Sequence, residues 1–68
     1  QPMGQGQLHD ALLALPEKLR MPLVLYYMEG YSVSETAQLL RIPAGTVKSR
    51  LNKARKILRE TLQEREEQ

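Results

Sequence analysis

The sequence predicts an all-α fold: four helices that form a helix-turn-helix domain, with a long C-terminal recognition helix and no winged element. Apolar residues recur at helical spacing, no segment alternates apolar and polar residues as a strand does, and Pro or Gly separates the periodic segments. The chain has 68 residues, which is enough for one domain at most.

The first helix is predicted to begin at Leu8. Apolar residues fall at positions 8, 11, 12 and 15, which is the stripe of a short amphipathic helix, and His9 lies off that stripe on the surface. The preceding segment QPMGQGQ has two glycines and no periodicity. Residues 1–7 are therefore expected to be a disordered lead-in or a segment foreign to the domain.

The second helix is predicted to start at Pro16 and to end near Glu29. Proline suits the first helical position because its missing N–H has no partner there, and Glu17 favours the positive end of the helix dipole. Gly30 provides the stop. Pro22, inside the segment, predicts a kink or a locally loosened turn.

The third helix is predicted from Val33 to Leu40 or Arg41. Ser32 and Glu35 have the S-x-x-E spacing of a capping box. Ala37 is small because the two helices of a helix-turn-helix cross closely near this position. Arg41, Ile42 and Pro43 break the helix, and Ile42 is expected to be an apolar plug beneath the turn.

The last helix is predicted to run from Ala44 to about Gln63. Helical periodicity places one group of apolar residues on a single side, which we assign to the core: Val47, Leu51, Ala54, Ile57, Leu58 and Leu62. The domain therefore covers residues 8–63, and residues 64–68 are expected to be an acidic, frayed tail.

Charge is unevenly distributed along the chain. Residues 1–35 carry a net charge of −2, residues 36–59 carry +7 without any acidic residue, and residues 60–68 carry −3. A solvated helix face usually mixes acids with bases at neighbouring turns, which the central stretch does not do. It indicates a surface that binds a polyanion, most often nucleic acid.

The polar face of the last helix carries side chains that suit DNA. Lys can donate to guanine, Asn can pair with adenine, and Ser can do either, so Ser49, Asn52 and Lys53 are candidates for reading bases. Thr46 and the first-turn amides could hold a phosphate, and Gly45 would allow close approach. Four further cations would add phosphate contacts or remain in solvent: Arg50, Arg55, Lys56 and Arg59.

Other classes of function lack the residues they need. The chain has no Cys and a single His, so no disulfide, zinc site or other cofactor site can be assembled, and no nucleophile and base can be assigned to an enzyme. The longest apolar run is too short for a bilayer, and no signal peptide is evident. A soluble, cytoplasmic protein is expected.

Four segments together resemble region 4 of bacterial sigma factors of the extracytoplasmic-function group: ALLALPEKLR, MEG before a capping Ser, SETAQLL and IPAGTVKSRLNKARKIL. The resemblance runs from about Leu8 to Leu62. It implies recognition of the promoter −35 element while bound to RNA polymerase in a bacterial cytoplasm. DNA contacts of the family carry over to Thr46, Lys48, Ser49, Asn52 and Lys53, with Ser34 and Tyr26 at the DNA backbone.

The resemblance also implies protein partners. In the family an apolar surface binds the flap of the polymerase β subunit and anti-sigma proteins compete for it; Leu12, Leu19, Leu23 and Tyr27 could form this surface or simply pack in the core. Three residues depart from the common pattern. Tyr26 stands where many members have Arg, Thr36 replaces a usual Ile, and Arg41 replaces a frequent Gly.

Two alternatives remain open from the sequence. One is the DNA-binding output domain of a LuxR-type response regulator, which has a similar TVK segment but lacks the Leu-Pro and SRL-x-x-AR features. The other is a module that acts chiefly by docking polymerase or an anti-sigma factor. Because sigma factors of this group read the −10 element with a separate upstream domain, a domain of this size is expected not to initiate transcription alone.

Overall fold

The computed structural model describes residues 3–66, and the side chains of residues 7–64. Within this range the chain is helical and contains no strand. The elements are α1 (Met3–Ala14), α2 (Glu17–Leu23), the π-helical segment η1 (Val24–Met28), α3 (Val33–Leu40) and α4 (Ala44–Glu66). The predicted all-α class and the four-helix order are confirmed.

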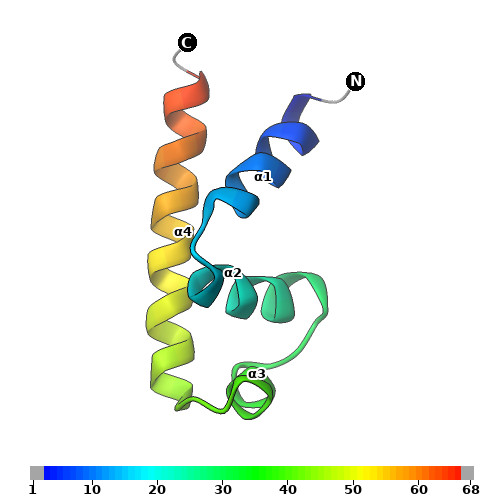
Figure 1. Ribbon diagram of the computed structural model, residues 1–68, viewed down its shortest axis with the longest axis vertical. Coiled ribbons are helices and arrows are strands. Elements are labelled where there is room, and N and C mark those ends of the chain that lie inside the picture. The colour runs from blue at the N-terminus through cyan, green and yellow to red at the C-terminus, as the bar shows by residue number, and fades with distance from the viewer. Residues whose placement is uncertain (1–2, 67–68) are drawn as a thin grey trace.

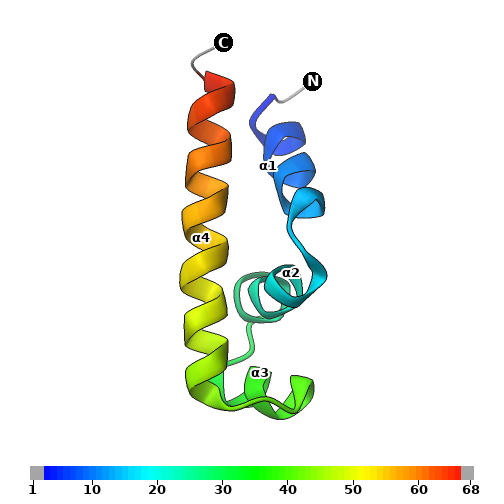
Figure 2. The same cartoon turned by 60° about the vertical axis from the view of Figure 1, so that its left-hand side comes forward.

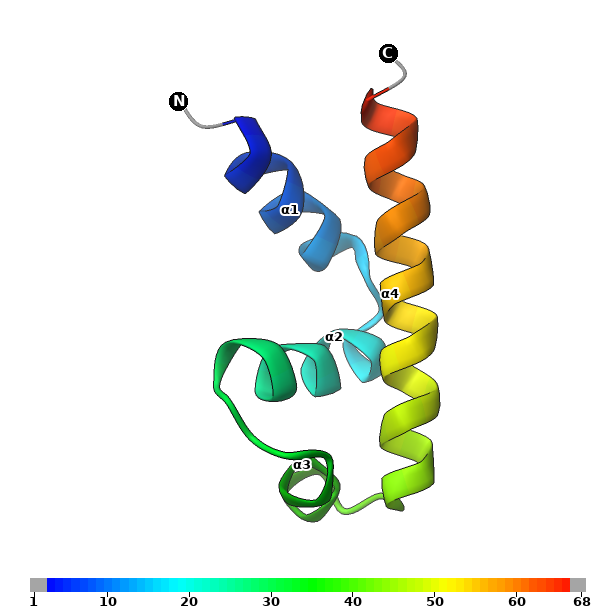
Figure 3. The same ribbon diagram turned by 180° about the vertical axis from the view of Figure 1, so that it is seen from behind.

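The long helix α4 organises the fold. It runs the length of the molecule, and α1, α2 and α3 all contact it. Seen from two further sides, α2 and η1 cross α4 steeply near its middle while α3 lies beside its N-terminal end (Figures 2 and 3). The first turn of α1 and the last turn of α4 lie at the same, opposite end of the molecule (Figure 1).

The core forms where the helices meet α4. The predicted apolar side of α4 is confirmed for five of its six residues: Val47, Leu51 and Ala54 are buried, and Ile57 and Leu58 are partly buried against them. Leu62 is half-buried and does not belong to this core cluster. The facing residues come from the other three helices and, for Leu15, from the joint between α1 and α2: Leu12, Leu15, Leu19, Leu23 and Ala37. Ala54 is fully buried, so its small side chain lets α4 and the helices packed on it approach closely.

Helix α1 begins earlier than the sequence indicated. Its first residue is Met3, whereas we expected an irregular segment up to residue 7 and a helix from Leu8. Gly4 and Gly6 lower helix propensity, which is why this turn was not expected, but propensity is a weak constraint when a helix only has to be extended by one hydrogen bond per residue. Residues 1 and 2 lie outside the described residues.

The joint between α1 and α2 depends on backbone carbonyls. Pro16 precedes α2 in an extended conformation (φ −56°, ψ 147°) instead of occupying its first position, and its carbonyl accepts the Leu19 and Arg20 N–H groups at 2.9 Å. Arg20 Nη1 donates to the carbonyls of Leu13 and Leu15 at 3.2 and 3.1 Å. The guanidinium therefore ties the end of α1 to the start of α2.

The loosened turn predicted at Pro22 is present. Pro22 is buried within α2 and has no N–H to donate, and the helix widens into η1 two residues later. The Glu29 N–H donates to the Val24 carbonyl at 3.1 Å, which is the i→i−5 pattern of a π-turn. Gly30, with φ +83°, then ends the segment as expected.

The ends of α3 agree with the sequence. Glu35 N–H donates to Ser32 Oγ at 3.0 Å and Ser32 N–H donates to Glu35 Oε1 at 2.8 Å, so the capping box is complete. Arg41 has the left-handed conformation (φ 59°, ψ 47°) that a Gly would adopt without strain. Ile42 is partly buried against the core, as predicted for the plug.

Helix α4 continues three residues past the predicted end at Gln63, to Glu66. Of the tail expected at 64–68, residues 64–66 are therefore helical and residues 67 and 68 lie outside the described part. No helix in the described part combines the length and the apolar character needed to cross a membrane.

Candidate nucleic-acid interface

The side of α4 that faces away from the core carries the predicted base-reading residues. Ser49, Asn52 and Lys53 are exposed, as are Lys48 and Lys56, while Thr46 and Arg50 are half-buried at the two shoulders. Their direction follows from the buried side: once Val47, Leu51 and Ala54 face the core, helical periodicity sends the intervening positions outward.

The N-terminus of α4 offers fewer free amides than we expected. The carbonyl of Pro43 already accepts the N–H groups of Thr46 and Val47, at 3.0 and 3.2 Å. Within the described residues, only the Ala44 and Gly45 amides of this turn are left to an outside acceptor. A Cβ on Gly45 would meet no atom within 4 Å, so this end of the helix is open to solvent.

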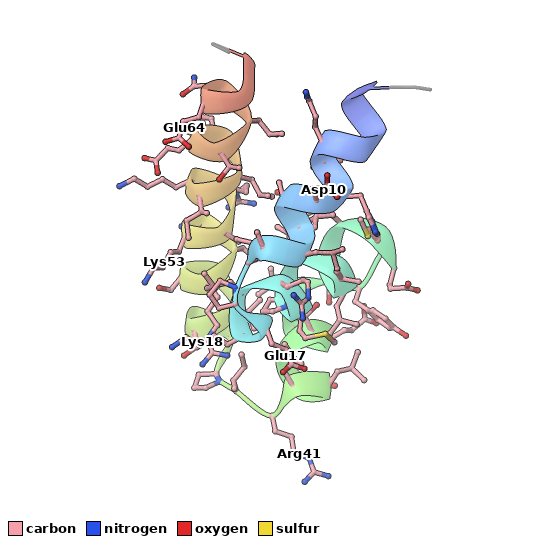
Figure 4. All side chains as sticks on the ribbon, turned by 45° about the horizontal axis from the view of Figure 1, so that its top comes forward. Asp10, Glu17, Lys18, Arg41, Lys53 and Glu64 are labelled. Carbon is pink, nitrogen blue, oxygen red and sulfur yellow. The ribbon has the colours of Figure 1, made fainter. Side chains whose placement is uncertain are left out.

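Two concave surfaces flank the outward face of α4. On one side, Lys18 and Leu19 of α2 meet a group of α4 residues around a space of about 320 Å³: Gly45, Thr46, Ser49, Arg50 and Lys53. Figure 4 shows Lys18 and Lys53 on the same side of the molecule. The sequence analysis did not predict a role for Lys18, because no local pattern connects this residue to the polar face of a helix that begins 26 positions after it.

The other concave surface lies between α4, η1 and α3. It encloses about 280 Å³ and is lined by Tyr26, Val33, Lys48, Leu51, Asn52 and Arg55. Tyr26 is half-buried against the core, so only part of its side chain can reach DNA from here. Ser34, the other residue expected at the DNA backbone, is exposed in the first turn of α3.

The cations of α4 are not neutralised within the domain. Among the side chains of residues 7–64, no carboxylate forms an ion pair with any of them, so the net charge of +7 over residues 36–59 is not balanced by a neighbouring acid. A concentration of positive charge on one helix attracts a polyanion over distances of about 10 Å at moderate salt. The electrostatics therefore support the predicted polyanion surface.

Arg55 behaves differently from the other cations. It is half-buried, and its guanidinium donates hydrogen bonds to the Tyr27 hydroxyl and to Asn52 Oδ1. The Cζ atom also lies 5.8 Å from the centre of the Tyr27 ring, within the range of a cation–π contact. Arg55 was expected at phosphates or in solvent; instead it links η1 to the polar face of α4.

A third, apolar groove lies between α1, the end of α2, η1 and α4, and Arg55 borders both this groove and the concave surface beside α3. It encloses about 430 Å³ and is lined by Leu8, Leu12, Leu23, Val24, Tyr27, Met28, Arg55 and Leu58. Tyr27 and Met28 are exposed, whereas Leu12 and Leu23 are buried and form its floor. Leu19 is also buried, but it lines the concave surface beside Lys18 and not this groove. The partner surface expected from the sequence therefore does not include Leu19.

Comparison with known proteins identifies similar sequences over most of the chain. Residues 5–58 match the family model described as Sigma-70, region 4. The chain is 39% identical over 57 residues to the ECF RNA polymerase sigma factor SigW of Bacillus subtilis, which covers 84% of this chain and 30% of that protein.

Two further relatives are also sigma factors. The RNA polymerase sigma-H factor of Pseudomonas aeruginosa is 37% identical over 59 residues, covering 87% of this chain and 31% of that protein. The ECF RNA polymerase sigma factor SigM of Mycobacterium tuberculosis is 47% identical over 45 residues, covering 66% of this chain and 23% of that protein. The chain thus spans less than a third of the length of these relatives, and none of the three supports the LuxR-type alternative.

Proposed function

Because this chain belongs to the sigma-70 region 4 family, we propose that it binds the −35 element of a promoter, as part of a sigma factor that directs RNA polymerase in transcription initiation. The observation that carries the proposal is the outward face of α4, where Ser49, Asn52 and Lys53 are exposed beside unneutralised cations. The module acts by binding, in the bacterial cytoplasm where promoter DNA and polymerase are found.

The exposed face divides into two kinds of contact. Ser49, Asn52 and Lys53 enter the major groove and contact base edges. The residues around them contact phosphates and fix the register without choosing a sequence: Lys48, Arg50, Lys56, Thr46, Ser34 and Tyr26. Lys18 adds a phosphate contact from α2, because it shares a concave surface with Arg50 and Lys53.

The apolar groove supplies a second contact, with RNA polymerase. A groove whose exposed rim is Tyr27 and Met28 and whose floor is Leu12 and Leu23 fits an apolar helix, such as one presented by the flap of the β subunit. An anti-sigma factor would compete for the same groove. A pull-down with the isolated β flap, using the variant Met28→Asp as the disrupted control, tests this contact.

The DNA proposal is tested by titrating duplex DNA at several salt concentrations. About four or five phosphate contacts predict that log K falls with log salt with a slope near −4. A slope near zero would contradict the proposal. The measurement can be made on the domain and on the domain bound to the β flap, which holds the weak DNA contacts in place.

A pair of variants separates base reading from phosphate contact. Lys53→Ala is expected to change which sequence binds best, with a loss of about 1–3 kcal/mol at one base pair. Lys56→Ala is expected to weaken all duplexes alike, since a phosphate contact carries no sequence information. If both variants acted uniformly on all sequences, the base-reading face would be misassigned.

A further inference from the structure

We infer that Arg55 is a positioning residue: it holds the side-chain amide of Asn52 so that this amide presents hydrogen-bond donors to the bases, and Tyr27 in turn holds Arg55. The inference rests on the proposed function. It adds to that function the class of base that Asn52 reads, namely a base with acceptors at its major-groove edge.

The contacts of Arg55 fix its orientation from two sides. Nη1 donates to the Tyr27 hydroxyl and Nη2 donates to Asn52 Oδ1. The guanidinium also lies against the Tyr27 ring, with 5.8 Å between Cζ and the ring centre. Because the guanidinium is planar and its donors form a rigid fork, holding one side at Tyr27 sets the position of the other side at Asn52.

Tyr27 is itself held in place by its neighbours. Its ring packs edge-to-face on Tyr26, with 4.9 Å between the ring centres, and Tyr26 packs against the core. The hydrogen-bonded series Tyr27, Arg55, Asn52 therefore begins at an anchored aromatic pair and ends at an exposed amide on α4. A phosphate-binding Arg, by contrast, would have its guanidinium free to point into solvent.

This arrangement orients the Asn52 amide and sets the charge beside its oxygen. Oδ1 accepts a hydrogen bond from Arg55, while no group among the described residues accepts from Nδ2. Two-point pairing with adenine needs Oδ1 to accept from N6 and Nδ2 to donate to N7. Oδ1 keeps a second lone pair, but the Arg55 guanidinium beside it places positive charge and N–H donors at this point. A donor such as adenine N6 is disfavoured there, whereas guanine offers acceptors at N7 and O6 to which Nδ2 can donate.

Asn52 is therefore expected to favour guanine over adenine at the base pair that it contacts. The side chain also connects two surfaces, because Tyr27 and Arg55 line the apolar groove while Arg55 and Asn52 line the concave surface beside α3. Partner contact in the groove and base contact at the DNA share one side chain, Arg55.

A selection from a duplex library with randomised central positions tests the base assignment. The chain is expected to enrich guanine at one position, and Asn52→Ala to lose the preference there. Arg55→Ala and Arg55→Lys are both expected to lower the guanine-over-adenine ratio at that same position by about tenfold. Arg55→Lys keeps the positive charge, but one ammonium cannot reproduce the fork between Tyr27 and Asn52.

The control is Lys56→Ala, which is expected to weaken every duplex alike and to leave the preference unchanged. Two results would overturn the inference. One is a full rescue of the wild-type preference by Arg55→Lys, and the other is a uniform loss of binding in Arg55→Ala, since both are the behaviour of a phosphate contact.

A second measurement needs no DNA. In the amide NMR spectrum of the free chain, the Asn52 side-chain resonances are expected to shift in Arg55→Lys and in Tyr27→Phe, which lacks the accepting hydroxyl, but not in Arg59→Ala. Unchanged resonances in Arg55→Lys would overturn the inference whatever the DNA result. A wild-type chain that selects no sequence would instead contradict the proposed function, while the spectrum still decides whether Arg55 holds Asn52.

Discussion

Thr36 is the polar side chain that the core of this domain encloses completely. Its exposed fraction is 0%, and Oγ1 has no hydrogen-bond partner among the described residues. A hydroxyl that is buried without a partner loses its hydrogen bond to water, which lowers the stability of the folded state. The hydroxyl of Thr36 is therefore a weak point of the core.

Replacing this hydroxyl by a methyl group should make the domain more stable. Thr36→Val keeps the shape of the side chain and removes the unpaired group, so the free energy of unfolding is expected to rise by about 1–2 kcal/mol. Urea denaturation measures the change. Thr36→Ser is the control: it keeps the hydroxyl, removes a buried methyl group, and should lower stability. A Val variant less stable than the wild type would contradict this explanation.

The position of a single residue could be predicted from the sequence where local periodicity sets it, but not where a contact between distant segments does. Ser49, Asn52 and Lys53 were placed correctly because helical periodicity alone sets their direction. Arg55 was not, because its partner Tyr27 lies 28 positions away, and the crossing of η1 over α4 that brings the two together is not encoded in any local pattern. Which bases or phosphates these residues contact stays a prediction.

At the level of elements, α3 depends most on its ends. It has eight residues, too few for a helix to be stable by itself, so its caps and its packing on α4 keep it formed. The capping box satisfies amides at its start. At its end, Arg41 adopts φ 59°, a conformation in which the Cβ of an L-residue is crowded.

Relieving this crowding should stabilise the helix end. Arg41→Gly is expected to raise the free energy of unfolding by about 1 kcal/mol relative to Arg41→Ala, since both variants lose the charge but only Gly adopts the left-handed conformation freely. Chemical denaturation of the two variants side by side measures this difference. Equal stabilities would show that the left-handed conformation carries no strain here.

The element boundaries were predictable where a local signal marks them. Ser32 and Glu35 mark the start of α3, and Pro43 marks the break before α4, because capping side chains and missing N–H groups act within one turn. The start of α1 was less accessible, because extending a helix through Gly depends on packing that propensities do not describe. Pro22 predicted a loosened turn, but the π-helical form of η1 was not predicted from the sequence.

At the scale of the whole molecule, one core supports every element. α1, α2 and α3 each contact α4, so loss of packing on α4 affects all three at once. A domain of 68 residues has a free energy of unfolding of roughly 3–10 kcal/mol. A single large cavity can therefore remove much of its stability.

Truncating Leu51 tests how strongly the domain depends on packing against α4. It is 3% exposed and lies in the centre of the core, so Leu51→Ala is expected to lower the free energy of unfolding by about 2–5 kcal/mol and the thermal midpoint with it. Circular dichroism on heating measures the effect. Leu39→Ala is the matched control, because Leu39 is 55% exposed and its truncation should change little. Similar losses in both variants would argue against a single core on α4.

The arrangement of the helix ends has a practical consequence for tethering the domain. The first turn of α1 and the last turn of α4 leave the molecule together, at the end away from Gly45 and α3 (Figure 1). If DNA binds the outward face of α4 as we propose, a polypeptide fused to either end, such as a fluorescent tag, starts at the end of the molecule away from the N-terminus of α4. Surface-immobilised or labelled versions should therefore keep their recognition helix accessible from both attachment points.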